Sequence, residues 1–240
     1  MTSLYVVNYT GGGYGNFIAS LLICSISNQS STVRYSETGN AHDYYHSYIK
    51  NNASNYNEKL YREYHKSEYF TKLKSTDPKM PLVLVTPDPN LDYSLIFETD
   101  PNFKIIIIKA EGSDLLQLEY NHFYKNYLHQ ELSPANVYWN DYLSESESNP
   151  KIRKGLSSLI QLSPEERLVL INRRRRYSPP RYEIPNEYQS HVCYIKAFDV
   201  INNKDEVLKT LHECTGMKIT PAIIDSYDNY LSLQCRYKLP

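Results

Sequence analysis

Apolar residues along the chain form short runs that alternate with stretches of helical spacing. The first run, residues 4–7, reads Leu-Tyr-Val-Val and leads into a glycine-rich segment, residues 11–15. Beyond that segment, Phe17, Ile18 and Leu21 recur at the spacing of one helix face. This pattern predicts a strand, a glycine-rich loop and a helix in succession.

Two later runs predict buried strands. Residues 82–85 read Leu-Val-Leu-Val, and residues 105–108 are four consecutive isoleucines. Consecutive β-branched residues fit a strand that is covered on both faces, as in a parallel sheet. Further strands are expected over residues 31–36 and 192–196.

Helical patterns fill the intervals between these strands. We expect helices over residues 60–73, 113–129, 163–175, 203–214 and 220–233. Ser163, Pro164 and Glu166 form a helix start signal, and Asn203 with Glu206 is expected to cap another helix. Strands that alternate with helices predict an α/β fold with three layers, in which helices flank a mostly parallel sheet.

The length and composition are those of one globular domain. The chain has 240 residues, 41% hydrophobic and 22% charged, so we expect a single domain over residues 1–240 with a helical elaboration at about 130–180. The formal net charge is −1, which argues against a protein that coats DNA. Residues 1–150 carry 11 basic and 17 acidic side chains, whereas residues 151–240 carry 15 and 10. The second part would therefore attract an anionic ligand.

The four cysteines are widely spaced and include no Cys-x-x-Cys pair, so no metal site is expected. The apolar stretch at residues 17–26 is interrupted by Ser20, Cys24 and Ser25, and neither a signal peptide nor a membrane span is predicted. These features predict a protein with free thiols in a reducing cytoplasm.

The glycine-rich loop is the main candidate for a binding site. Its residues are Gly11, Gly12, Gly13, Tyr14, Gly15 and Asn16, and they hold four of the eight glycines in the chain. Glycines allow successive backbone N–H groups to point inward, and a helix start adds further N–H donors and partial positive charge. The loop is therefore predicted to bind phosphate or sulfate; the alternative is a tight connection with no ligand. No Gly-Lys-Ser/Thr follows, so the segment is not a Walker A motif.

The order of these segments resembles the sulfotransferase family, whose fold is of the P-loop nucleotide-binding type. Residues 82–86, which end in Thr, and residues 103–109, followed by Asp114, resemble two of its strands, and residues 192–216 resemble its closing strand and helix. With residues 39–42, Gly-Asn-Ala-His, the pattern also resembles proteins from marine phages. The resemblance covers about two thirds of the chain in pieces.

The resemblance implies a ligand and its contacts. The first-strand loop would hold the 5′-phosphosulfate of 3′-phosphoadenosine 5′-phosphosulfate, and Lys109 would stand at the 3′-phosphate site. A basic segment late in the family's chain closes over that phosphate, and its counterpart here would be the run Arg173, Arg174, Arg175 and Arg176. Asn121 and Lys125, one turn apart on the helix expected after Lys109, would supplement the same site. The arginine run has a simpler interpretation as a solvated helix end that complements the helix dipole.

The sequence departs from the family at three positions. The first loop has no lysine, Pro87 stands where the family has a catalytic histidine, and Lys109 replaces an arginine. A lysine cannot offer the planar fork of an arginine. His42, which follows the predicted second strand, is the remaining candidate for a general base; an exposed loop histidine with no role is the alternative.

These features are consistent with two classes of function. The first is a sulfotransferase-like enzyme that binds a phosphosulfate or nucleotide donor and transfers a sulfuryl group to an acceptor. The second is a catalytically inactive viral protein that keeps the fold for contacts with a protein partner or for virion assembly. The missing lysine and histidine favour the second class, and the retained glycines favour the first.

Overall fold

The computed structural model describes residues 4–9, 14–28, 32, 33, 35, 41, 82–86, 91–110 and 183–234. The chain divides into two compact units, Met1–Glu111 with Pro179–Arg236, and Gly112–Ser178 with Tyr237–Pro240. All described residues belong to the first unit. The helices predicted over residues 60–73, 113–129 and 163–175 lie outside the described residues.

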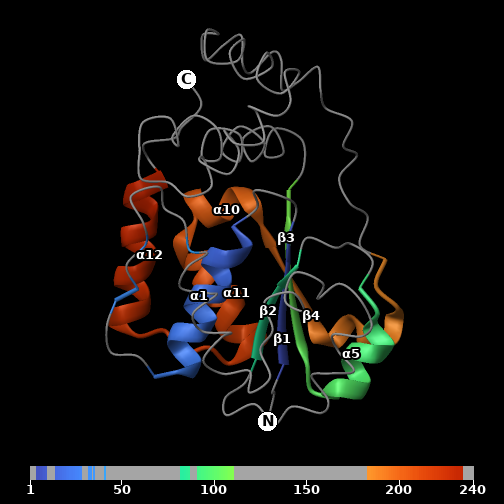
Figure 1. Cartoon of the computed structure of the whole chain (residues 1–240). Coiled ribbons are helices and arrows are strands. Elements are labelled where there is room, and N and C mark those ends of the chain that lie inside the picture. Colours follow the sequence, from blue (N-terminus) through green and yellow to red (C-terminus); the bar gives the residue numbers. More distant parts are fainter. Residues whose placement is uncertain are drawn as a thin grey trace, which may run out of the picture. The chain divides into compact units, whose positions relative to one another are not determined.

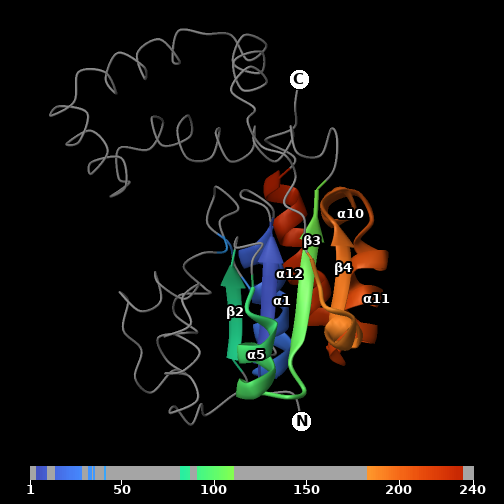
Figure 2. The same cartoon turned by 90° about the vertical axis from the view of Figure 1, so that its right-hand side faces the viewer.

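A four-stranded parallel sheet forms the centre of the first unit. Its strands are β1 (Leu4–Tyr9), β2 (Leu82–Thr86), β3 (Lys104–Lys109) and β4 (Val192–Lys196), in the spatial order β2-β1-β3-β4. Every neighbouring pair runs parallel (Figures 1 and 2). The predicted parallel α/β fold is confirmed. Strands β2, β3 and β4 lie within one residue of their predicted positions, and β1 continues two residues beyond the predicted run at 4–7.

Helices cover both faces of the sheet. One face carries α1 (Gly15–Ile26), α11 (Lys204–Thr215) and α12 (Pro221–Gln234), and the opposite face carries α5 (Tyr93–Thr99) (Figure 2). The short helices η3 (Asn186–His191) and α10 (Ala197–Asn202) stand before and after β4. The sequence did not predict α5, which begins where the Asp92 carboxylate accepts the Leu95 N–H.

The four isoleucines of β3 lie at the centre of the core. Ile105, Ile106 and Ile107 are 0% exposed and Ile108 is 1% exposed, as expected for a strand between two helical layers. On α1, Phe17 stacks on Tyr230 of α12 with ring centroids 3.7 Å apart, and the Tyr227 hydroxyl donates to the Val200 carbonyl at 2.8 Å. Tyrosines therefore build part of the core between α1 and α12.

The strand predicted over residues 31–36 is wrong at the positions that the structure describes. Thr32, Val33 and Tyr35 belong to no strand. The Val33 N–H donates to Ser226 Oγ at 2.8 Å, and Asn229 Nδ2 donates to the Val33 carbonyl at 3.3 Å. Side chains of α12 thus satisfy the peptide groups that a neighbouring strand would otherwise pair.

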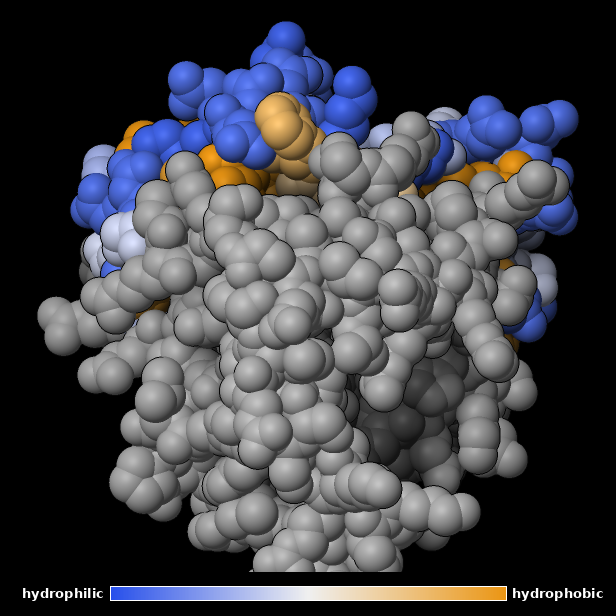
Figure 3. Space-filling model, turned by 90° about the horizontal axis from the view of Figure 1, so that it is seen from above, coloured by the Kyte–Doolittle hydropathy of each residue, from blue (hydrophilic) through white to orange (hydrophobic). Residues whose placement is uncertain are grey.

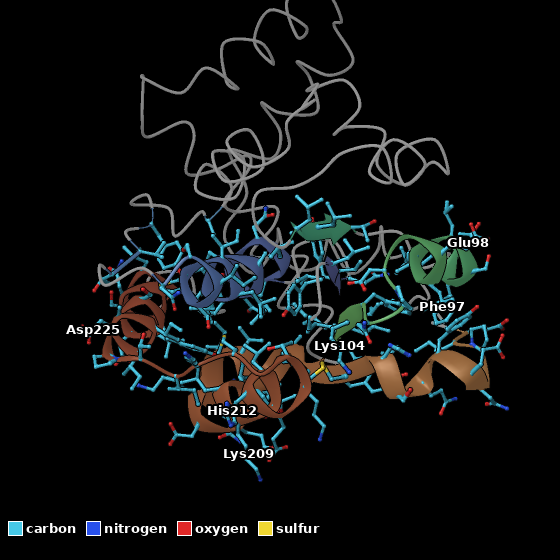
Figure 4. The ribbon with its side chains drawn as sticks, turned by 90° about the horizontal axis from the view of Figure 1, so that it is seen from below. Phe97, Glu98, Lys104, Lys209, His212 and Asp225 are labelled. Atoms are coloured by element: carbon cyan, nitrogen blue, oxygen red, sulfur yellow. A yellow bond between two sulfur atoms is a disulfide. The ribbon has the colours of Figure 1, made fainter. Side chains whose placement is uncertain are left out.

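The cysteine prediction is also wrong for two of the four residues. Cys193 of β4 and Cys214 of α11 form a disulfide, with their Cα atoms 6.1 Å apart (Figure 4). They are 21 residues apart in the sequence, but the packing of α11 on β4 brings them together. Cys24 is a buried free thiol. The cytoplasmic location stays a prediction.

Helix α11 begins after Asn203 as expected, but the Asn203 side chain makes no capping hydrogen bond. Within the described ranges, no helix is long and apolar enough to cross a membrane.

Candidate anion-binding site at the carboxyl end of the sheet

The strand order places a topological switch point at the carboxyl ends of β1 and β3. Strand β1 lies between β2 and β3, so the chain continues from β1 to β2 on one side of β1 and later forms β3 on the other side. Ligands of open α/β sheets bind at such a switch point, outside the carboxyl ends of the strands. The predicted glycine-rich loop leaves β1 at this end, directly after Tyr9 and Thr10.

One face of the sheet becomes polar at this end. Register pairs Asn8 of β1 with Thr86 of β2, and Lys109 of β3 with Lys196 of β4. Asn8 and Thr86 are 0% and 2% exposed. Because side chains alternate along a strand, Asn8, Thr86, Lys109 and Lys196 share the face opposite α1. Each of the four strands thus places a polar residue at its end on one face.

Helix α1 starts beside the end of β1. Tyr14 precedes it in the left-handed conformation, φ 60° and ψ 9°, and no side chain of the described residues caps the helix. The first turn contains no acidic residue. Among the described residues no side chain caps the first N–H groups of α1, so these groups and the positive end of the helix dipole can face an anion there, with the half-buried Asn16 in the first turn.

The side chain of Tyr14 serves packing. Its ring is 8% exposed and meets the Tyr230 ring edge to face, with centroids 6.4 Å apart. Only the backbone of Tyr14 is therefore suited to contact a ligand, although the residue belongs to the predicted loop.

Gly15 has a steric reason to be glycine. A Cβ at this position would overlap the Tyr9 ring, at 2.7 Å from both Cε1 and Cγ. Because Cγ lies close to the Tyr9 backbone, the ring cannot simply swing away. The close contact between β1 and α1 therefore requires Gly15 independently of any ligand.

The Lys109 side chain points toward β4. Its Nζ lies 3.8 Å from the centroid of the Tyr194 ring, and Tyr194 pairs with Ile107, two residues before Lys109. This is a cation–π contact. Partial burial raises the pKa of Tyr194, so the hydroxyl remains protonated at neutral pH. Lys109 thus stands at the predicted strand end, with its ammonium group held on the β4 side.

The structure describes four of the predicted site residues, namely Tyr14, Gly15, Asn16 and Lys109. The remaining ones lie outside the described residues: Gly11, Gly12, Gly13, His42, Asn121, Lys125, Arg173, Arg174, Arg175 and Arg176. Sequence reasoning missed Asn8, Tyr194 and Lys196 at the same end of the sheet. The lysines that end the strands at 104–109 and 192–196 were the available signal, because parallel strands bring their carboxyl ends together.

Viewed from above, the described residues are visible mainly along one edge of the picture, where hydrophilic residues predominate with smaller hydrophobic areas between them (Figure 3). In the described part of the chain, no group of three or more His, Cys, Asp or Glu side chains is arranged to hold a metal ion. The side chains described at the strand ends are amide, hydroxyl and ammonium donors, from Asn8, Thr86, Lys109 and Lys196.

No protein-family model matches the chain, and no curated protein sequence matches it. Among solved structures, the chain is similar to the sulfotransferase domain from the curacin biosynthetic pathway, with a TM-score of 0.37 and 11% sequence identity. The alignment covers 95% of this chain and 78% of that domain.

Proposed function

We propose that this protein is sulfotransferase-like and binds a phosphosulfate or nucleotide donor, 3′-phosphoadenosine 5′-phosphosulfate, at the carboxyl end of β1. The proposal rests on one observation: α1 begins at the switch point of the sheet with no side-chain cap among the described residues and no acid in its first turn. An anionic phosphosulfate would accept hydrogen bonds from these N–H groups.

Two further features support this ligand. The segment before α1 contributes Gly11, Gly12 and Gly13, which can bring backbone N–H groups close to a phosphate oxygen. Lys109 lies at the end of the strand next to β1 and supplies positive charge. The sequence pattern shared with sulfotransferases points to the same donor.

The transfer step would move a sulfuryl group from the donor phosphate to an acceptor hydroxyl. The bond between sulfur and the bridging oxygen breaks, a bond from sulfur to the acceptor oxygen forms, and the acceptor proton passes to a base. His42 is the proposed base, because Pro87 stands at the family's usual position. Backbone donors of the loop and of α1 would stabilise the charge on the departing phosphate.

Calorimetric titration with 3′,5′-bisphosphoadenosine tests donor binding. We expect Gly13→Val to abolish binding by blocking close approach of the phosphate, and Asn16→Ala to weaken it by about 1–2 kcal/mol for one lost donor. Asn186→Ala is the matched control, because Asn186 is exposed and lies before the amino end of β4.

The outcome separates the two classes of function. If the wild-type protein gives no binding heat at millimolar nucleotide, or Gly13→Val binds as tightly as wild type, donor binding at the loop is wrong. The inactive interaction protein would then be the better interpretation. If the donor binds, loss of sulfuryl transfer in His42→Ala with unchanged donor affinity would assign the base.

A further inference from the structure

The Cys193–Cys214 disulfide joins two elements that other contacts already hold in place. All five residues of β4 are in register with β3, and α11 contacts β4. Helix α11 buries Val207, Leu208 and Leu211, so its place in the fold rests on apolar packing. Loss of the sulfur–sulfur bond should therefore leave β4 and α11 folded.

The last turn of α11, which carries Cys214, is also fixed without the disulfide. The Gly216 N–H donates to the His212 carbonyl at 2.8 Å, with Gly216 in the left-handed conformation at φ 72°. Thr215 Oγ1 donates to the Leu211 carbonyl at 2.6 Å. These hydrogen bonds close the helix end. A reduced Cys214 would therefore stay within reach of its former partner, and the same bond could form again.

The disulfide is open to solvent from the α11 side. Both cysteines are half-buried. Close to Cys214 in the chain, His212 (Figure 4) and Gly216 are exposed, and a Cβ at Gly216 would meet no atom within 4 Å. Cys193 lies deeper, on a strand beside β3, where Ile105 is 0% exposed. A small thiol can therefore approach Cys214 more easily than Cys193.

The fold also provides a partner for the reduced form of Cys193. Its Sγ lies 3.7 Å from the Ile105 carbonyl oxygen. In the disulfide this sulfur carries no hydrogen, whereas a thiol S–H is a weak donor that can use this oxygen. The same backbone positions therefore accommodate both the oxidised and the reduced sulfur.

We propose that Cys193–Cys214 is a thiol–disulfide exchange site, which a small dithiol reduces in the folded protein. A thiolate of the dithiol attacks Cys214 Sγ, the bond between the two protein sulfurs breaks, and Cys193 leaves as a thiolate that takes up a proton. The second thiol of the reagent then attacks the mixed disulfide, and Cys214 leaves and takes up a proton in turn. Two electrons and two protons thus pass to the protein, and the dithiol becomes its own disulfide. This inference does not depend on the proposed donor binding.

The urea dependence of reduction tests whether the folded protein reacts. The full chain is treated with dithiothreitol at urea concentrations below the unfolding transition, and the released thiols are alkylated and located by mass spectrometry. Reduction through the unfolded chain would follow the unfolding equilibrium, which rises by at least about fivefold per molar urea. Direct attack on the folded protein should be proportional to the dithiol concentration and should change by less than about twofold over the same range.

Two further measurements test the point of attack and the reversal. With excess glutathione, a monothiol, and an acid quench, the trapped mixed disulfide should be on Cys214. Oxidised dithiothreitol should restore the Cys193–Cys214 bond. Cys235→Ser is the matched control, because Cys235 lies outside the described residues and is the other cysteine of the C-terminal part of the chain. This variant should be reduced and reoxidised at the wild-type rates.

Each result decides the inference. Reduction that follows the unfolding equilibrium, or a reduced protein without a cooperative melting transition, would overturn it and leave a purely structural disulfide. Glutathione trapped mainly on Cys193 would overturn attack at Cys214. Reoxidation that links Cys235 in place of either partner would overturn the reversible pair. Nucleotide titrations test the donor site independently of all these outcomes.

Discussion

Replacing Gly15 by alanine should destabilise the protein through the Tyr9 ring. The added Cβ would overlap that ring, at 2.7 Å from Cε1 and Cγ, and overpacking of this kind costs about 1–3 kcal/mol. Alanine is also the better helix former by up to about 1 kcal/mol, so the contact and the propensity act in opposite directions. We expect the contact to dominate, because relief requires movement of the strand end or the helix start.

A double-mutant cycle measured by urea unfolding isolates this contact. In the wild-type background Gly15→Ala should lower the free energy of unfolding by about 1–3 kcal/mol, and in the Tyr9→Ala background it should have no effect or a stabilising one. Gly216→Ala is the control, because Gly216 has φ 72° and open space around its Cβ position; its cost should be independent of Tyr9. If Gly15→Ala is as stable as wild type while Tyr9 is present, the steric argument is wrong.

Three other predictions concern the core. Ile107→Asp should unfold the protein, since a buried unpaired carboxylate costs several kcal/mol against a total free energy of unfolding of about 5–15 kcal/mol. Phe198→Asp is the control: this side chain is 57% exposed, so the variant should melt cooperatively in a thermal scan. Reduction of Cys193–Cys214, which closes a separation of 21 residues, should lower the free energy of unfolding by about 3 kcal/mol; equal stability with and without a dithiol would contradict this. Burial raises the pKa of Tyr230 well above 10.0, so this hydroxyl ionises at a lower pH in the unfolded chain than in the folded protein. The free energy of unfolding should therefore fall as the pH rises above 10.0, and it should fall less steeply in Tyr230→Phe than in the wild-type protein.

The sheet was predictable because its strands carry the strongest local signals. Four consecutive isoleucines at 105–108 have few alternatives to a strand covered on both faces, and both faces are indeed covered. The segment 31–36 has β-type residues but no such run, and its backbone at Val33 is bonded by Ser226, 193 residues away. Local pattern cannot reveal a partner at that distance. The same limit applies to Cys193 and Cys214, which meet only after α11 packs on β4.

The candidate site was predictable only in part, for a related reason. Periodicity and the glycines located the start of α1, and the resemblance to sulfotransferases singled out Lys109. The neighbours of Lys109 depend on strand order and register, which place β4 next to β3 and Tyr194 within reach of the ammonium group. No spacing along the chain predicts a contact between residues 109 and 194.

Gly15 shows why ligand binding must be tested at other positions of the loop. A glycine in such a loop is often taken as evidence for a bound phosphate, but the Tyr9 ring already excludes a side chain at Gly15. Loss of nucleotide binding in Gly15→Ala would therefore report a displaced α1 as readily as a blocked phosphate. Asn16 is half-buried in the first turn of α1, and its amide can be removed without adding any atom beside Tyr9. A loss of affinity in Asn16→Ala with an unchanged melting temperature would therefore be direct evidence for an anion at the start of α1.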